Sequence, residues 1–341
     1  MEPTALQLTW FVLLGVLMAG YAILDGFDLG AGILHLFARN DTERRIFMNS
    51  IGPIWDGNAV WLVTFGGALF AAFPYVYAAA FSGFYLPFML LVFALIFRAV
   101  AIEFRSKQPM RWWRQVWDVS FCAGSLLASF LFGLAMGNMV RGISLNEHHE
   151  FAGDLHSLLN PYALWMGVTT VALFTMHGSI YLAMKTEGDL QQRVRSWINS
   201  CIIGFIICHA ILSLATLLYL PHTTETIKHH PLFFPLVVVV ILAIANIPRA
   251  IHLERDFEAF LSSGATMGLL MILFGLGIFP NMVYSNPNPE NSLTVYNGSS
   301  SAKTLRVMLI IAAIGMPVVL AYSACIYWIF RGKVKLTESS Y

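Results

Sequence analysis

Two aspartates stand at the end of an apolar segment that begins near Leu6, within a stretch rich in glycine. Asp25 and Asp28 lie three residues apart, so on a helix their carboxylates share one face. A carboxylate at membrane depth costs several kcal/mol unless it faces a polar partner or a cavity. Such acids carry protons or pair with a buried cation, and the spacing indicates one of these two chemistries.

Three more charged residues fall near the ends of the next two apolar segments. Asp56 lies in the first turns of the second segment, where the helix dipole favours a negative charge. Arg98 and Glu103 lie near the end of the third. If these ends share one side of a membrane, the charges form a partly buried acid–base cluster that can conduct protons. The predicted proton pathway consists of Asp25, Asp28, Asp56, Arg98 and Glu103.

Each of these side chains also has a simpler interpretation. Acids near helix ends can reach the membrane surface, and Asp56 can be an ordinary helix N-terminal residue. Arg98 can anchor the cytoplasmic side of its segment. The shared depth of the whole set, in glycine-rich apolar sequence, favours the functional interpretation.

Two further patterns concern helix contacts. Trp55, Asn58 and Trp61 recur every three residues and lie along one stripe of the second segment. Anchoring at the membrane surface together with packing explains this stripe, and the alternative is that it faces a partner subunit. Gly26 and Gly30 are four residues apart, a spacing of small residues that lets another helix come close.

The composition is that of an integral membrane protein. Of the 341 residues, 57% are hydrophobic and only 11% are charged, whereas soluble domains carry about 25% charged residues. The net charge of +1 gives no indication of a nucleic acid partner. We predict an all-α polytopic membrane protein with a single integral domain over residues 1–341. Nine apolar segments approach or exceed the roughly 20 residues that cross a bilayer: 6–35, 53–74, 77–103, 116–140, 161–184, 199–220, 231–251, 262–284 and 304–330.

The loop charges predict how these segments are oriented. With nine crossings, most of the 20 Lys and Arg residues fall on one side, and the exceptions are Arg141, Lys228, Lys303 and Arg306. Cytoplasmic loops carry the excess of Lys and Arg. We therefore expect the N-terminus outside and the C-terminus in the cytoplasm. This topology places all the candidate pathway residues at the cytoplasmic end.

Histidine and cysteine do not indicate a metal or heme site. Hemes in membrane bundles take ligands from within helices. Of the ten histidines, only His177 and His209 lie well inside predicted segments, since His35 and His252 are at cytoplasmic ends. We interpret them as buried histidines that are hydrogen-bonded across helices. The four cysteines lie in apolar segments without CxxC spacing and are expected to be reduced packing residues.

Several motifs resemble subunit II of the cytochrome bd-type quinol oxidases. The likeness is dense over residues 20–120, where it includes residues 25–30, 52–64, 66–74 and 97–107. It is thinner beyond, for example at Asn160-Pro161 and Phe279-Pro280. Ala59 departs from the pattern, since many relatives carry Glu or Gln there, and this position is not expected to carry a proton.

The resemblance implies a heterodimer of two similar nine-helix subunits in membrane lipid, each with two four-helix bundles and one peripheral helix. Subunit I would hold hemes b and d and oxidise quinol. This subunit would ligate no heme, and it would contribute proton and O2 routes for the reduction of O2 to water. Trp55, Asn58 and Trp61 would face subunit I along an O2 route. A non-catalytic quinone on this subunit and a small single-helix accessory subunit stay open.

Two other functions fit the same residues. A stand-alone proton-coupled transporter or channel would use the buried acids for a gradient, but such proteins usually show internal repeats with broken helices at mid-membrane, and no clear repeat of the acid motif is present. In a purely structural scaffold, the acids would only stabilise assembly. The expected location is a bacterial or archaeal cytoplasmic membrane.

Overall fold

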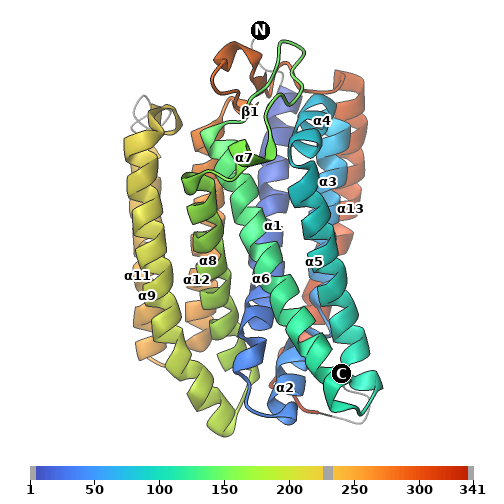
Figure 1. The fold of residues 1–341 in the computed structure, drawn as a ribbon, viewed down its shortest axis with the longest axis vertical. Coiled ribbons are helices and arrows are strands. Elements are labelled where there is room, and N and C mark those ends of the chain that lie inside the picture. The colour runs from blue at the N-terminus through green and yellow to red at the C-terminus, as the bar shows by residue number, and fades with distance from the viewer. Residues whose placement is uncertain (1–4, 226–232, 337–341) are drawn as a thin grey trace.

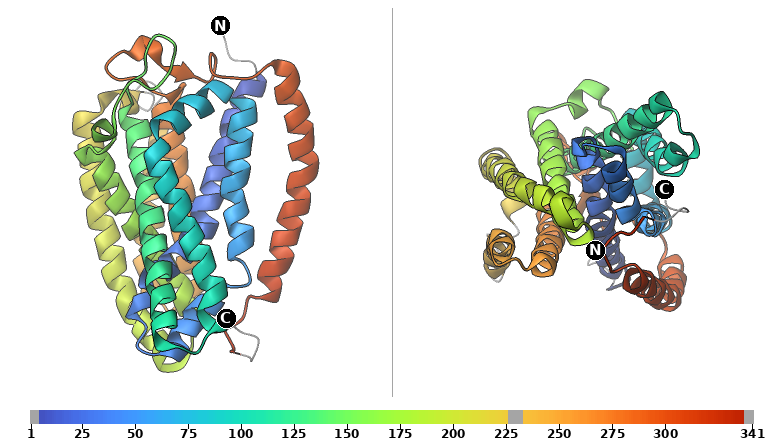
Figure 2. Two further views of the ribbon diagram at one scale, coloured as in Figure 1. Left: turned by 45° about the vertical axis from the view of Figure 1, so that its right-hand side comes forward. Right: turned by 90° about the horizontal axis from the view of Figure 1, so that it is seen from below.

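A computed structural model describes residues 5–225 and 233–336, which form a bundle of long helices (Figure 1). Eight helices of this described part are long and apolar enough to cross a membrane, so the chain is an all-α polytopic protein. The first helix begins at one end of the bundle and the last one finishes at the other (Figures 1 and 2). The long helices are α1 (Ala5–Leu34), α3 (Trp55–Ala72), α5 (Tyr85–Phe104), α6 (Arg111–Arg141), α8 (Pro161–Lys185), α9 (Gly188–Tyr219), α11 (Phe234–His252), α12 (Asp256–Ile278) and α13 (Ala302–Ile329).

The predicted crossing at residues 53–74 corresponds to α3, which is not among the eight. It has 18 residues and carries Asp56 and Asn58 in its first turns, so it is shorter and less apolar than its neighbours. It nevertheless lies along α1 within the bundle (Figure 1). The ninth crossing and the expected orientation therefore stay predictions.

The predicted segment at residues 77–103 is divided between two helices, α4 (Pro74–Gly83) and α5. Pro74 disfavours a helical conformation at Phe73, which ends α3. The ring of Pro87 clashes with a helical carbonyl four residues earlier, that of Gly83, and α4 ends there. The prediction of one continuous segment was wrong because it counted apolar residues and did not weigh these two prolines.

Other boundaries differ for similar reasons. The helix α9 begins at Gly188, well before the predicted start at residue 199, because its polar first turns continue beyond the apolar part. The helix α12 ends at Ile278, before Phe279-Pro280, and a short strand β1 (Asn281–Val283) follows, paired antiparallel with β2 (Leu293–Thr294). Lys228 and the start of the seventh predicted segment, residues 231–232, lie outside the described residues.

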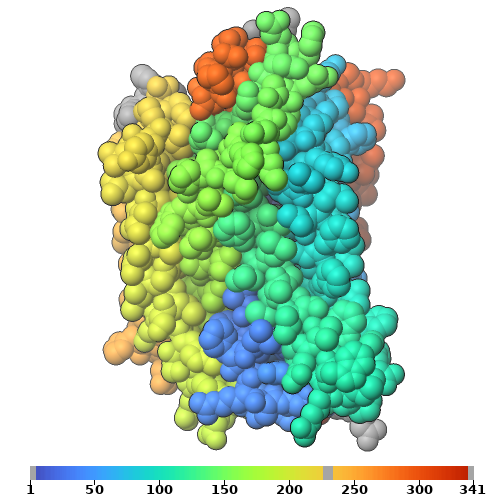
Figure 3. Space-filling view, in the orientation of Figure 1, coloured from blue at the N-terminus to red at the C-terminus, as the bar shows by residue number. Residues whose placement is uncertain are grey.

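A short helix that the apolar pattern did not predict, α2 (Asp41–Ile51), closes one end of the bundle beside α9 and α6 (Figures 1 and 3). The Asn40 side chain accepts from the Glu43 N–H at 2.9 Å, and the Glu43 carboxylate accepts from the Arg39 N–H at 2.7 Å. Glu43 also pairs with Arg193 of α9. Partial burial acts to raise the pKa of Glu43, but these hydrogen bonds outweigh it and hold the pKa below its usual range.

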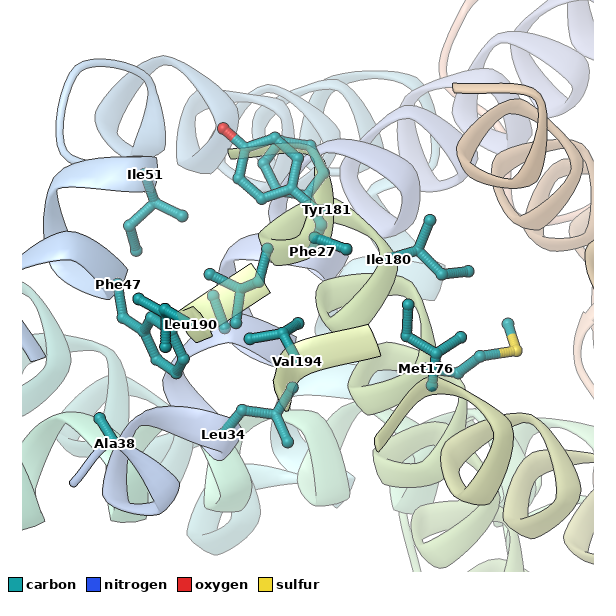
Figure 4. Close-up of a cluster of buried hydrophobic side chains, with 14 of the residues drawn as sticks. Phe27, Leu34, Ala38, Phe47, Ile51, Met176, Ile180, Tyr181, Leu190 and Val194 are labelled. Carbon is teal, nitrogen blue, oxygen red and sulfur yellow. The ribbon is translucent and has the colours of Figure 1, made fainter. Parts of the chain in front are cut away.

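Apolar side chains from four helices pack together above α2 (Figure 4). Phe27 of α1, Phe47 of α2, Tyr181 of α8 and Val194 of α9 are almost completely buried there. Each large buried side chain contributes about 1.5–3 kcal/mol relative to exposure to water. The Tyr181 hydroxyl also donates to the Ser50 carbonyl at 2.7 Å. This cluster holds α2 against the ends of α1, α8 and α9.

Glycines set the distance between α1 and α8, which cross within the bundle. A Cβ added to Gly30 would lie 1.9 Å from the Phe174 carbonyl oxygen, and one added to Gly178 would lie 2.5 Å from the Gly30 carbonyl carbon. Gly26 lies against the Phe174 ring, 3.1 Å from where its Cβ would be. The two helix backbones are therefore in direct contact at Gly30.

The helix α13 stands at the edge of the bundle (Figure 2), and Leu305 is its only buried residue among those described. Two hydrogen bonds hold its ends. The Trp10 indole donates to the Leu305 carbonyl at 2.9 Å, and the Tyr327 hydroxyl donates to Asn58 at 2.7 Å. A peripheral helix was expected; the division of the others into two four-helix bundles stays a prediction.

We expect Gly30→Ala to destabilise the protein, because the added methyl group has to push two helix backbones apart. Overpacking of this kind costs about 1–3 kcal/mol. Gly15→Ala is the matched control on the same helix, since no atom lies within 4 Å of its added Cβ. Thermal unfolding of the purified protein in detergent measures both. Equal unfolding temperatures for the two variants would show that the close contact is not needed.

Candidate functional site

The centre of the candidate site is an ion pair between α1 and α5, buried in the described structure. Arg98 Nη2 lies 2.9 Å from Asp25 Oδ1, and Nη1 lies 3.4 Å from Oδ2. The side chains of Arg98 and Asp25 are 2% and 0% exposed. Arg98 comes from the part of α5 that packs on Gly124 of α6, where an added Cβ would meet the Ala94 carbonyl at 2.6 Å. The glycine brings α5 close enough for the guanidinium to reach α1.

Asp28 lies one turn further along the same face of α1 and is also fully buried. Asn58 of α3 donates to its Oδ2 at 2.8 Å and to the Leu24 carbonyl at 3.2 Å. Tyr327 in turn holds the amide of Asn58. No described donor reaches Oδ1 of Asp28, and no described salt bridge includes this carboxyl. The arrangement thus brings one guanidinium to two buried carboxyls.

Two of the predicted pathway residues lie elsewhere. Asp56 is exposed on the outward side of α3, and Glu103 is half-buried near the end of α5. Neither forms a salt bridge with another described residue. The sequence placed Arg98 in one acid–base cluster with Asp25, Asp28, Asp56 and Glu103, and within that set it forms a salt bridge with Asp25. The reason is the rotation of α3, which turns Asn58 inward and Asp56 outward.

The stripe of Trp55, Asn58 and Trp61 faces this chain's own bundle. Asn58 is 2% exposed, the ring of Trp61 lies on Gly20 of α1, and Trp55 packs on the cluster of Figure 4. The alternative that this stripe faces a partner subunit does not fit Asn58, which is buried. For Trp55 and Trp61, which are partly exposed, it stays a prediction. The outward face of α3 carries Asp56, Val60 and Val63 instead.

A second charged cluster, which the sequence analysis missed, surrounds Asp118 of α6. Its carboxylate accepts from His35 Nε2 at 2.6 Å, from Arg105 Nε at 2.5 Å and from Arg44 Nη1 at 2.7 Å. Asp118, His35 and Arg105 are at most 1% exposed. Asp41 joins the cluster to the surface, since it accepts from Arg105 at 2.8 Å and is 44% exposed.

The signal for this cluster was present in the sequence but had a simpler interpretation. Asp118 is an acid in an apolar helix, as Asp25 is, yet it follows Arg111, Arg114 and Trp117. Basic and tryptophan residues of this kind are typical of the end of a membrane segment, where an acid can contact water and needs no partner. Because Asp118 lies in the second turn of α6 and not before it, it is buried and bonds two arginines and a histidine.

The histidine His177 of α8 is hydrogen-bonded across helices, as expected. Its Nδ1 lies 2.6 Å from the Ser263 hydroxyl of α12, and its Nε2 lies 3.1 Å from the Ile23 carbonyl of α1. Its ring is stacked on Phe260 at 4.7 Å between centroids. Both nitrogens are engaged, so His177 does not fit as an axial heme ligand. In the described residues, no three His, Cys, Asp or Glu side chains lie close enough together to hold a metal ion.

These features define a multi-pass helical membrane protein with ionisable groups paired inside the bundle. Such groups mark proton or ion routes in membrane proteins. The chain belongs to the cytochrome bd oxidase subunit II family, because the family model "Cytochrome bd terminal oxidase subunit II" matches residues 6–330. It is thus a subunit of a quinol oxidase complex that contains hemes and includes a subunit I.

Similar proteins agree with this family over nearly the whole chain. The Escherichia coli (strain K12) "Cytochrome bd-I ubiquinol oxidase subunit 2" is 35% identical, over 96% of this chain and 95% of the relative. The Bacillus subtilis (strain 168) "Cytochrome bd ubiquinol oxidase subunit 2" is 34% identical, over 96% and 97%. A chain in the structure of bd oxidase from Geobacillus thermodenitrificans has the same fold, with a TM-score of 0.80, 15% identity, and coverage of 96% and 99%. These relatives are bacterial, and the archaeal location gains no support from them.

Because Asp25 and Arg98 form a buried pair, we predict that the loss of stability caused by removing one of them depends on whether the other is still present. Arg98→Leu leaves a buried carboxylate unpaired, which costs about 3–5 kcal/mol, whereas replacing both partners by apolar residues is often nearly neutral. We expect the double variant Asp25→Leu/Arg98→Leu to unfold at a higher temperature than Arg98→Leu. A double variant less stable than either single variant would contradict the pairing. Thermal unfolding of the complex in detergent provides the measurement.

Proposed function

We propose that this subunit supports the heme-bearing subunit I and supplies protons from the cytoplasm for the reduction of O2 to water. The observation that carries the proposal is the presence of two buried carboxyls, Asp25 and Asp28, beside a single guanidinium of Arg98. If both acids were ionised, the buried site would carry a net negative charge, which a low-dielectric interior disfavours. One proton balances the charge, so the site can take up and release a proton.

The position of the site supports uptake from the cytoplasm. The end of the bundle closed by α2 carries Arg44, Arg105, Arg114 and Arg193, and basic residues concentrate on the cytoplasmic side of membrane proteins. Asp28 lies within two helical turns of His35, where α1 reaches this end. We therefore place the C-terminal end of α13 in the cytoplasm and the start of α1 outside.

Asp56 fits a different part of the same function. It is exposed on a face of α3 that also carries Val60 and Val63, 48% and 73% exposed. A carboxylate among apolar side chains is unfavourable against lipid. We place this face against subunit I, where Asp56 would pass protons from the cytoplasm toward the partner. Glu103 is half-buried at the end of α5 and fits a position at the cytoplasmic surface.

We assign heme ligation and quinol oxidation to subunit I. His177 has both ring nitrogens engaged and packs between Phe27 and Phe260. His209 is stacked on Phe205 at 5.5 Å and is half-buried on α9. The hemes supply the reduction of O2 in the complex, and this chain's residues hold and move protons. The outward face of α3 is the candidate for an O2 route along the partner.

The Asp28→Asn and Asp56→Asn variants test the proposal in the assembled oxidase. Asn keeps the size of the side chain but cannot carry a proton, and we expect O2 consumption with quinol to fall about tenfold or more. The heme spectrum and subunit ratio should stay native. The matched control is Asp189→Asn, an exposed acid at the start of α9, which should keep full turnover.

Other outcomes of the same measurement separate the alternatives. Full turnover in both variants, with a native heme spectrum, would refute proton delivery through these residues. Loss of hemes or of subunit I would instead indicate that the acids serve only assembly. Proton flux through this subunit alone in vesicles, without any heme, would favour a transporter or channel.

A further inference from the structure

A buried lysine joins the ends of two helices at the end of the bundle closed by α2. Lys185 is the last residue of α8 and is 9% exposed. Its ammonium donates to the carbonyls of Phe330 and Gly332, the latter at 3.3 Å, and Phe330 is the residue that follows α13. The last carbonyls of a helix lack intrahelical partners and carry a partial negative charge. One cation therefore binds at the C-terminal ends of both α8 and α13.

The chain after α13 extends this contact. The Val334 N–H donates to the Lys185 carbonyl at 2.9 Å, and the Lys333 ammonium donates to the Ala183 carbonyl at 3.2 Å. Residues 330–334 therefore form a strap that ties the end of the peripheral helix to α8. The helix α13 stands at the edge of the bundle (Figure 2), and no described residue of its last turns is buried. The strap is thus the main constraint on the depth of its last turn.

Tyr327 lies in that last turn. It is half-buried and packs, together with Ile326, against the cluster of Figure 4. Three residues separate it from Phe330, which is about 4.5 Å along the helix axis. If the strap were released and α13 moved along its axis, the Tyr327 hydroxyl would move with it and would lose its 2.7 Å hydrogen bond to Asn58.

The hydrogen bonds of Asn58 fix the direction in which its amide points. Its Nδ2 donates to the Leu24 carbonyl at 3.2 Å as well as to Asp28 Oδ2 at 2.8 Å. A backbone carbonyl only accepts hydrogen bonds, so the nitrogen must face α1. The Oδ1 atom then faces the other way and accepts from Tyr327. Asn58 is 2% exposed, so without that hydroxyl a buried acceptor would be left unpaired, which destabilises this orientation.

The Asp28 carboxyl depends on the orientation of this amide. Asn58 donates to one of its oxygens, and the other has no described donor. Asp28 is 0% exposed, so bulk water does not replace a donor that is lost. A turned amide would present its oxygen instead, and the carboxyl could then bond it only while protonated. The orientation seen here suits an acid that has to release its proton, because the donor stays in place afterwards.

We propose that Tyr327 positions the Asp28 carboxyl through Asn58, and that Lys185 and the strap hold Tyr327 at the depth at which it can do so. The consequence for turnover rests on the function proposed above, whereas the orientation of Asn58 does not. Tyr327 does not itself take up the proton. The peripheral helix thereby controls the hydrogen bonding of a buried acid on α1.

Thermal unfolding of the assembled oxidase in detergent tests the contact between Tyr327 and Asn58. Tyr327→Phe should lower the unfolding temperature, because it leaves the Asn58 oxygen without a donor. In an Asn58→Leu background the same change should cause no further decrease. Tyr322→Phe is the matched control on α13, since Tyr322 is 63% exposed, and it should unfold as the parent does. No decrease in the parent, or an equal decrease in both backgrounds, would overturn the proposal.

Turnover tests the link from Tyr327 to Asp28. Tyr327→Phe should lower kcat for O2 consumption several-fold and leave the KM for quinol and the heme spectrum unchanged, whereas Tyr322→Phe should keep native turnover. Combined with Asp28→Asn, Tyr327→Phe should cause no further loss, because both changes act on one carboxyl. Native turnover of Tyr327→Phe while Asp28→Asn is slow, or a loss that multiplies that of Asp28→Asn, would overturn the proposal.

Full turnover of Asp28→Asn would have a different meaning. It would refute the proposed function, and the unfolding experiment would then decide by itself whether Tyr327 orients Asn58.

Lysine variants test the strap. Lys185→Met should lower turnover as Tyr327→Phe does and should cause no further loss when the two are combined. Lys333→Met removes a single bond of the strap and should cause a smaller loss. The control is Lys335→Met, at an exposed position of the same segment, which should keep native turnover. If Lys185→Met prevents assembly, Lys333→Met decides alone, and native turnover there would refute the role of the strap.

Discussion

Charge inside an apolar bundle has to be paired, and the Asp25–Arg98 ion pair is the interaction on which the arrangement of α1, α5 and α6 depends. Removing either partner of a buried pair strands a charge, at a cost of about 3–5 kcal/mol. The pair therefore fixes the rotation and depth of α5 relative to α1. Asp118 imposes the same condition at the end of the bundle closed by α2, where it holds α6 to Arg105 and to Arg44 of α2. Two such points two turns apart leave little freedom between these helices.

Small residues make this pairing possible. Gly124 brings α5 close to α6, Gly32 admits Ser125, and Gly30 lets α1 touch α8. Helices in membranes associate through close packing and polar contacts, since lipid chains are as apolar as leucine. Here both kinds of contact involve the same helix, α1. Its glycines allow neighbouring helices to pack closely against it, and its carboxyl groups then lie within bonding distance of polar side chains on those helices.

The sequence was sufficient for the class of protein, the apolar segments and the family, because those depend on composition, length and motifs. It also showed that Asp25 and Asp28 share a face, which depends only on helix geometry. It did not show that Arg98 pairs with Asp25, because helix rotation about its own axis depends on packing among several helices. The same limit led to Asp56 being placed inward and Asp118 being overlooked. The helix boundaries around Gly83 could have been predicted from the positions of Pro74 and Pro87, which the count of apolar residues left out.

The charged residues of this chain fall into two groups, those paired inside the bundle and those exposed on its outer surface. Inside the bundle, Asp25 and Asp118 are satisfied by this chain's own cations, so that part of the structure needs no partner to be complete. On the outside, Asp56 and most residues of α13 are exposed. Lipid chains can cover the apolar side chains of α13, but the carboxylate of Asp56 needs a polar neighbour. The outward face of α3 is therefore the face that we propose a second subunit covers, whereas the ion pairs of Asp25 and Asp118 are formed within this chain.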